Sequence, residues 1–143
     1  MTFFVDANVI VCAATEGPYR EPCGRVLDAI ASGTASGRTS PAVLEEVWHV
    51  ERSGRAGNLH GLTERAYTVF TPLLDVTDEA FRLALALHAD RLGPADRLHV
   101  GTCRTHGLDT IVSADSAFSG LRGLRRVDPL DPPGMRRLLT GAG

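Results

Sequence analysis

Phe3-Phe4-Val5-Asp6, near the start of the chain, is a short apolar run that ends at a carboxylate. A run of this length bounded by a polar residue is typical of a buried strand in a parallel sheet. The stretch 110–115, Thr-Ile-Val-Ser-Ala-Asp, repeats this arrangement far downstream. Segments with apolar residues at spacings of three and four lie between the two runs, which is the pattern of amphipathic helices. Strands that alternate with helices predict an α/β fold with a central, mostly parallel sheet and right-handed crossovers.

Working outward from these two runs, the pattern predicts a series of short elements. Strands are expected over 3–5, 38–40, 73–76, 110–112 and 125–127, and helices over 8–14, 22–30, 41–52, 58–70, 78–91 and 95–106. Ser40 before Pro41 is a typical helix start, and Thr77 is an N-cap ahead of an acidic first turn. We expect one domain over residues 1–130 and a short C-terminal tail over 131–143.

Composition restricts the class of protein. The 143 residues suffice for one core, and 43% hydrophobic and 22% charged residues are ordinary globular values. The mixed composition excludes a disordered chain, a collagen and a coiled coil. Three widely spaced cysteines form neither a disulfide framework nor a C-x-x-C motif, which favours a cytoplasmic protein. No apolar run reaches the roughly 18 residues of a membrane span, and no basic leader precedes the first one, so we expect neither a membrane protein nor a secreted one.

Two carboxylates directly follow predicted strands, Asp6 and Asp115. The carboxyl ends of parallel strands share one edge of a sheet, where ligands bind in open α/β folds. Each aspartate alone is better explained as an N-cap of the following helix. Their equivalent positions favour a shared site.

Two further acids lie early in predicted helices. Glu46 lies at the edge of the apolar stripe of its helix, whereas Glu45 points away from it. Asp96 shares a mostly apolar face with His99 and Cys103. An acid on such a face is costly unless it is paired, protonated or bound to metal. A buried ion pair with arginine or a helix-dipole role for Asp96, and a surface position for Glu46, remain the alternatives.

Convergence of these acids would require a cation. Asp6, Glu46, Asp96 and Asp115 would repel one another, and hard divalent ions with oxygen ligands, Mg²⁺ or Mn²⁺, relieve that repulsion. Such a pocket suits hydrolysis of a phosphodiester, because the ion lowers the pKa of a bound water and stabilises charge on the phosphoryl oxygens. The chain carries no G-x-S-x-G, Walker A or G-x-G-x-x-G motif. The net charge of −2 does not exclude nucleic acid, since the residues outside this acid set are more basic than acidic.

Four blocks of the sequence resemble those of the PIN-domain ribonucleases, especially the VapC-type toxins of toxin–antitoxin pairs. The blocks are 4–10 (FVDANVI), 40–47 (SPAVLEEV), 93–100 (GPADRLHV) and 109–118 (DTIVSADSAF), and 123–129 fits the last strand of that family. The order and spacing of the blocks match over nearly the whole chain. The resemblance implies a PIN-like, Rossmann-like fold with metal-binding catalytic acids Asp6, Glu46, Asp96 and Asp115. It implies that Asn8 and Ser113 orient these acids. Glu46 fits the family spacing better than Glu45.

The resemblance also implies an activity and partners. Family members are Mg²⁺-dependent endoribonucleases that leave a 5′-phosphate, form homodimers and are silenced by a cognate antitoxin whose peptide lies in an apolar groove between helices. Their substrates are structured RNAs, and a single-stranded loop fits a site with few base-reading groups. Candidate phosphate contacts, each equally compatible with a solvated surface role, are Arg97, Arg104, Arg122, Arg125 and Arg126. We expect His99 and His106 in core or surface roles rather than as ligands, and Trp48 in the core.

Two other functional classes fit parts of the pattern. A phosphatase of the haloacid-dehalogenase type would use Asp6 as a nucleophile, but its D-x-D motif is Asp6-Ala7-Asn8 here, and the chain has no lysine for the phosphate. A non-catalytic PIN-like module would hold an ion at the same acids without turning over RNA.

Overall fold

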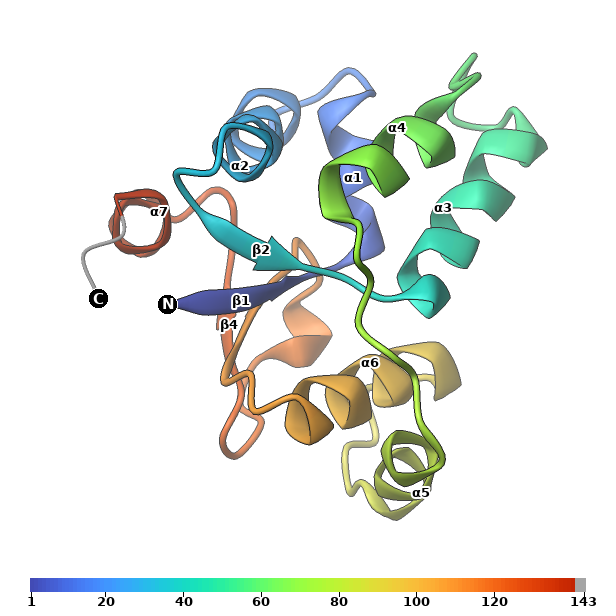
Figure 1. The fold of residues 1–143 in the computed structure, drawn as a ribbon, viewed down its shortest axis with the longest axis vertical. Coiled ribbons are helices and arrows are strands. Elements are labelled where there is room, and N and C mark those ends of the chain that lie inside the picture. Colours follow the sequence, from blue (N-terminus) through green and yellow to red (C-terminus); the bar gives the residue numbers. More distant parts are fainter. Residues whose placement is uncertain (141–143) are drawn as a thin grey trace.

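The computed structural model describes residues 1–140, which form a parallel sheet surrounded by helices (Figure 1). In chain order the elements are β1 (Thr2–Val5), α1 (Ala7–Ala13), α2 (Arg20–Ala31), β2 (Ser36–Arg38), α3 (Pro41–Ser53), α4 (Leu62–Phe70), α5 (Asp78–Ala86), α6 (Pro94–Thr105), β3 (Thr110–Val112), the 3₁₀ turn η1 (Ser116–Phe118), β4 (Arg125–Val127) and α7 (Pro132–Leu139). The strand order is β2-β1-β3-β4, and every neighbouring pair is parallel. The predicted α/β class with a parallel sheet is confirmed.

The core lies where the apolar strands meet the helices. Phe3, Phe4 and Val5 in β1 and Ile111 and Val112 in β3 have no exposed surface. In Figure 1, α2 and α4 lie on one side of the sheet and α5 and α6 on the other. Burial on both faces explains why the central strands are continuously apolar rather than alternating.

Residues 73–76 do not form the predicted strand. Leu74 donates one backbone hydrogen bond to the carbonyl of Thr39, 2.9 Å away, without any ladder on either side of it. The expected strand over 38–40 also lies two residues too late, since β2 ends at Arg38. The side chain of Thr39 donates to the carbonyl of Val5 at 2.8 Å, and Ser40 caps α3. Side-chain bonds to the backbone therefore replace the strand at this point.

Two helices are shorter than predicted, and in both cases a distant side chain binds the freed backbone groups. The helix expected over 78–91 ends at Ala86, and the guanidinium of Arg97 donates to the carbonyls of Leu87, Ala89 and Leu92 at 2.6–2.9 Å. The helix expected from residue 58 begins at Leu62, where the carboxylate of Glu51 accepts from the backbone of Gly61 and Thr63. Such contacts satisfy backbone groups that are left unpaired at and beyond the helix ends.

The segment expected as a tail contains α7, whose Met135 and Leu138 are buried in the hydrophobic core. None of the helices in residues 1–140 is long and apolar enough to cross a membrane.

Gly101 sets the distance between α5 and α6. A Cβ atom at this position would lie 2.2 Å from the carbonyl oxygen of Ala80, so Gly101→Ala should force the two helices apart. We expect a loss of about 2 kcal/mol in the free energy of unfolding, measured by urea denaturation. Gly24→Ala is the matched control, because nothing lies within 4 Å of a Cβ there, and it should stabilise α2 by about 0.5–1 kcal/mol. Equal effects of the two substitutions would contradict this account.

Candidate metal centre

The candidate site lies where β1 and β3 end. Asp6 follows β1 directly, and its backbone N–H donates to the carbonyl of Val112 in β3 at 3.1 Å. Asp6 is also the N-cap of α1, because its Oδ1 accepts from the N–H of Ala7 at 2.8 Å. It is only 4% exposed, so its charge is largely removed from water. The cap interpretation and the site interpretation of this residue are therefore compatible.

Asn8 and Ser113 connect Asp6 to the end of β3. The hydroxyl of Ser113 donates to Oδ2 of Asp6 at 2.7 Å, and the amide of Asn8 donates to the same oxygen at 3.0 Å. The amide oxygen of Asn8 accepts from the backbone of Ala114, and Ser113 Oγ accepts from the backbone of Asp115. These bonds fix the direction of the Asp6 carboxylate and tie it to the loop that carries Asp115.

Helices α3 and α6 bring Glu46 and His99 to the same place. The Nε2 atom of His99 lies 2.7 Å from Oε1 of Glu46, and one ligand atom each of Asp6, Glu46 and His99 lie within 4.8 Å of one another. The side chain of Glu46 is 35% exposed. Glu45 points outward, 3.7 Å from the exposed His49. The helical face argument thus places the members of the Glu45–Glu46 doublet correctly.

Asp96 lies on the first turn of α6 and is partly buried. Burial, followed by the charges of Asp6, Glu46 and Asp115, raises the pKa of its carboxyl to about 6, although His99 opposes this. Burial likewise raises the pKa of Asp6. The hydrogen bond from Ser113 lowers this pKa, and the charge of Glu46 raises it further. The charges of Asp6, Glu46 and Asp115 thus all act on the carboxyl of Asp96, whereas the close cluster of possible ligand atoms consists of Asp6, Glu46 and His99. Asp115 is the most exposed of them, and its carboxylate also caps η1 by accepting from Ala117 at 2.9 Å.

His99 is the member of the cluster that the sequence interpretation kept in the core. It is completely buried, as expected, yet it also contacts a site acid. Burial alone lowers the pKa of its imidazole, but the hydrogen bond to Glu46 and the charges of Glu46, Asp6 and Asp96 outweigh that effect and raise the pKa. The i, i+3 spacing from Asp96 was the available signal. His106 lies at the surface, 2.9 Å from the carbonyl of Asp75.

The five candidate arginines have different environments. Arg97 donates to the carbonyls of three residues in the segment that follows α5. Arg126 donates to the carbonyls of Ser113 and Ala114 and to Asp128, each at 3.0 Å. Both guanidinium groups thus hold the chain around the acids rather than project into solvent. Arg104, Arg122 and Arg125 are exposed.

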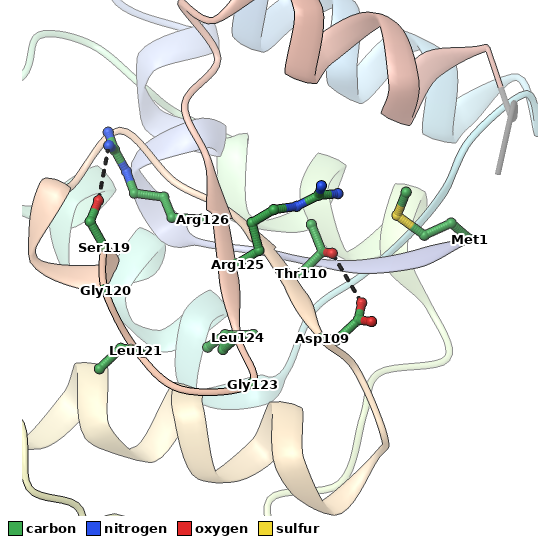
Figure 2. A pocket seen from close by; sticks show the side chains of 10 residues that line it. All are labelled: Met1, Asp109, Thr110, Ser119, Gly120, Leu121, Gly123, Leu124, Arg125 and Arg126. Atoms are coloured by element: carbon green, nitrogen blue, oxygen red, sulfur yellow. Dashed lines mark hydrogen bonds between the residues drawn. The ribbon is translucent and has the colours of Figure 1, made fainter.

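A cleft of about 850 Å³ lies at the opposite end of the sheet (Figure 2). Its lining includes Met1, Asp109 and Arg125, which stand at the amino ends of β1, β3 and β4. Because the strands are parallel, the acids lie at the other edge. Figure 2 shows the side chain of Arg125 extending along this cleft on the side of Thr110 and Met1.

Trp48 is not in the core, contrary to expectation. It is 56% exposed, and with Tyr67, which is 51% exposed, it lines a groove of about 600 Å³ between α3 and α4. The buried stripe of α3 is formed by Val43, Leu44 and Val47, which leaves Trp48 beyond its edge.

Stability of the metal-free protein should fall as pH rises from 3.8 to about 6. Asp96 titrates near 3.8 in the unfolded chain, but its pKa is about 6 when folded, so the folded state binds more protons in this interval. The expected loss is about 1 kcal/mol, after allowing for solvent screening of a partly exposed carboxyl. Asp6, whose pKa is also raised, acts in the same direction. Urea unfolding at a series of pH values measures the slope, which should flatten in Asp96→Asn. The same slope in Asp96→Asn as in the wild type would contradict the crowding of these acids.

The comparisons with known proteins agree with this fold. The family described as "PIN domain" matches residues 3–124. Ribonuclease VapC7 of Mycobacterium tuberculosis (strain ATCC 25618 / H37Rv) is 29% identical over 141 residues, which span 94% of this chain and 96% of that protein.

Solved structures show the same architecture. A toxin–antitoxin complex from Klebsiella pneumoniae superposes with a TM-score of 0.65 at 17% identity, covering 88% of this chain and 96% of that one. VapC20 of Mycobacterium tuberculosis, described as a Sarcin-Ricin loop cleaving toxin, gives a TM-score of 0.62 at 20% identity and covers 86% and 98%. At these identities the solved structures show a shared fold alone. The match to the family model extends over most of the sequence, and it shows that this chain belongs to the PIN domain family.

Proposed function

We propose that this protein is a divalent-metal-dependent endoribonuclease, the toxin of a toxin–antitoxin pair. The observation that carries the proposal is the cluster of acids at the carboxyl end of the sheet, where burial and mutual repulsion raise the pKa values of Asp6 and Asp96. Supporting it are the family match and the names of relatives that are ribonucleases and toxins.

The donor set fits a hard cation. Carboxylate oxygens of Asp6 and Glu46 lie close enough to share one ion, and Asp96 and Asp115 add charge to the same region. Oxygen ligands of this kind suit Mg²⁺ or Mn²⁺. Bound there, the ion would supply a water of lowered pKa and stabilise charge on the phosphoryl oxygens. We assign Asp6, Glu46, Asp96 and Asp115 as its ligands.

The other residues of the site orient the acids, contact RNA or hold the fold. Asn8 and Ser113 hold Asp6, and Arg126 fixes the backbone of the loop before Asp115, so the acids keep their positions without the ion. We assign Arg104, Arg122 and Arg125 to RNA phosphates at a distance from the cleaved bond. Arg104 lies in the last turn of α6, whereas Asp96 lies in the first, and its guanidinium donates to the carbonyl of Arg122. Arg125 lines the cleft at the amino ends of the strands. Arg97 and Arg126 act in the fold.

Partners and location follow from the same proposal. A cognate antitoxin would place an apolar segment in the groove lined by Trp48 and Tyr67, next to α3, which carries Glu46. The Klebsiella pneumoniae neighbour is itself described as a toxin–antitoxin complex. We propose a homodimer in the cytoplasm.

The test is cleavage of structured RNA by the purified chain. With Mg²⁺ or Mn²⁺ we expect internal cuts that leave 5′-phosphate ends, loss of at least about 100-fold in rate after EDTA treatment, and recovery when either ion is restored. Gel mapping and end-labelling measure these outcomes. Undiminished cleavage in EDTA would contradict metal dependence. Mn²⁺ binding without turnover of any RNA would instead indicate a non-catalytic module, and a trapped aspartyl-phosphate at Asp6 would indicate a phosphatase.

A further inference from the structure

The imidazole of His99 is enclosed between the acids and the core. It has no exposed surface, and its ring lies 5.8 Å from that of Phe4 at a tilt of 38°. Its Nε2 atom faces Oε1 of Glu46 at 2.7 Å. Its Nδ1 atom is buried without a hydrogen-bond partner in residues 1–140.

These contacts decide which nitrogen of His99 carries a proton. A proton on Nδ1 alone would bury an unpaired N–H and set the lone pair of Nε2 against a carboxylate oxygen, which costs free energy twice. Both the neutral Nε2–H form and the imidazolium donate from Nε2 to Glu46. The hydrogen bond therefore exists in either charge state of the ring.

Glu46 needs such a restraint. Its side chain is partly exposed, and the nearby charge of Asp6 would favour a rotamer directed into solvent. Holding it costs side-chain entropy that a charge-assisted hydrogen bond offsets. His99 is rigid because its ring is packed on all sides, so it fixes the carboxylate from the protein side.

We propose that His99 is a positioning residue, whose Nε2–H holds the Glu46 carboxylate beside Asp6 for the divalent ion while the imidazole stays outside the coordination shell. The inference rests on the proposed function in placing an ion at these acids. It extends that function by naming the contact that holds the Glu46 carboxylate in place.

The alternative role for His99 is direct ligation through Nε2. Metal-binding histidines almost always donate their other ring N–H to an acceptor, which fixes the ring. Nδ1 of His99 has no such acceptor among the described residues. The orphaned nitrogen therefore favours positioning over ligation.

The test measures Mn²⁺ binding to the full chain, independently of RNA. Isothermal titration with Mn²⁺ alone should show affinity about 10–100-fold weaker in His99→Leu, which keeps the apolar packing but removes the donor. His99→Gln, which retains an N–H donor, should restore most of the affinity. His49→Gln is the matched control, because His49 pairs with Glu45 at the surface, and its affinity should equal that of the wild type.

Pulsed EPR of bound Mn²⁺ separates the two roles. We expect no signal from a directly coordinated nitrogen in the wild-type spectrum. A signal from a coordinated imidazole nitrogen that is present in the wild type and absent in His99→Leu would overturn positioning in favour of ligation. Mn²⁺ affinity equal to that of the wild type in a folded His99→Leu would also overturn the inference. So would an equal loss of Mn²⁺ affinity in His99→Leu and His99→Gln, which would indicate a packing role for His99. Absence of Mn²⁺ binding by the wild type would overturn the metal centre and this inference together. Binding without RNA cleavage would count against the nuclease proposal alone and leave the affinity comparison decisive.

Discussion

Asp96→Asn should reduce RNA cleavage by about 1,000-fold while making the metal-free protein more stable. The carboxylate is assigned to the divalent ion, and removing that charge from a metal-assisted hydrolysis is expected to cost about 4 kcal/mol of transition-state stabilisation. In the folded protein without metal the same carboxylate is partly buried among other acids, which raises its pKa to about 6. Neutralising it removes this repulsion, so activity and stability should change in opposite directions.

Single-turnover cleavage with saturating Mg²⁺ and thermal unfolding in EDTA measure the two effects. Asp90→Asn is the control, since Asp90 is an exposed carboxylate in the segment between α5 and α6 and should change neither quantity appreciably. Full activity in Asp96→Asn would remove Asp96 from the site. A loss of activity that accompanies unfolding at the assay temperature would assign Asp96 to the fold instead.

The parallel α/β fold was predictable because its two central strands, β1 and β3, are buried on both faces and an aspartate follows each of them closely. Phe3 to Val5 and Thr110 to Val112 are strands, as the pattern indicates. The predicted strand at 73–76 failed because an extended apolar segment looks the same in sequence whether or not a neighbouring strand has free backbone groups to pair with it. Helix ends were missed where the capping group is distant in sequence, as with Arg97 at the end of α5.

The sequence singled out the acids of the candidate site together with Asn8 and Ser113, both of which hydrogen-bond to Asp6, but not the contacts of Arg126 and His99. Strand ends and helical periodicity are local signals, and they select Asp6, Glu46, Asp96 and Asp115, of which the first two and the last shift the pKa of Asp96 through their charges. Arg126 and His99 act through contacts made only in three dimensions, to the carbonyl of Ser113 and to the carboxylate of Glu46. Periodicity placed His99 on the same face of α6 as Asp96, but it gave no indication that the ring contacts Glu46 of α3.

Substitution of the two adjacent glutamates should have very unequal effects. Glu46→Gln is expected to lower RNA cleavage by about 100-fold or more, equivalent to about 3 kcal/mol, because it removes a carboxylate assigned to the ion. Glu45→Gln should leave cleavage within about twofold of the wild type, because Glu45 is exposed and pairs only weakly with His49. Both substitutions remove one negative charge from α3, so a general effect of charge on RNA attraction cancels in the comparison.

The geometry of α3 separates the roles of Glu45 and Glu46. Successive residues of an α-helix differ by about 100° in direction, so only one of two adjacent side chains can face the acids. Glu46 faces them and binds His99, and Glu45 faces solvent. Cleavage by Glu46→Gln at the wild-type rate, or a large loss in Glu45→Gln, would mean that the ion is held by a different set of side chains. A graded loss in both variants, disappearing at high salt, would point to electrostatic attraction of RNA rather than to metal binding, because screening weakens exposed charges far more than buried ligands.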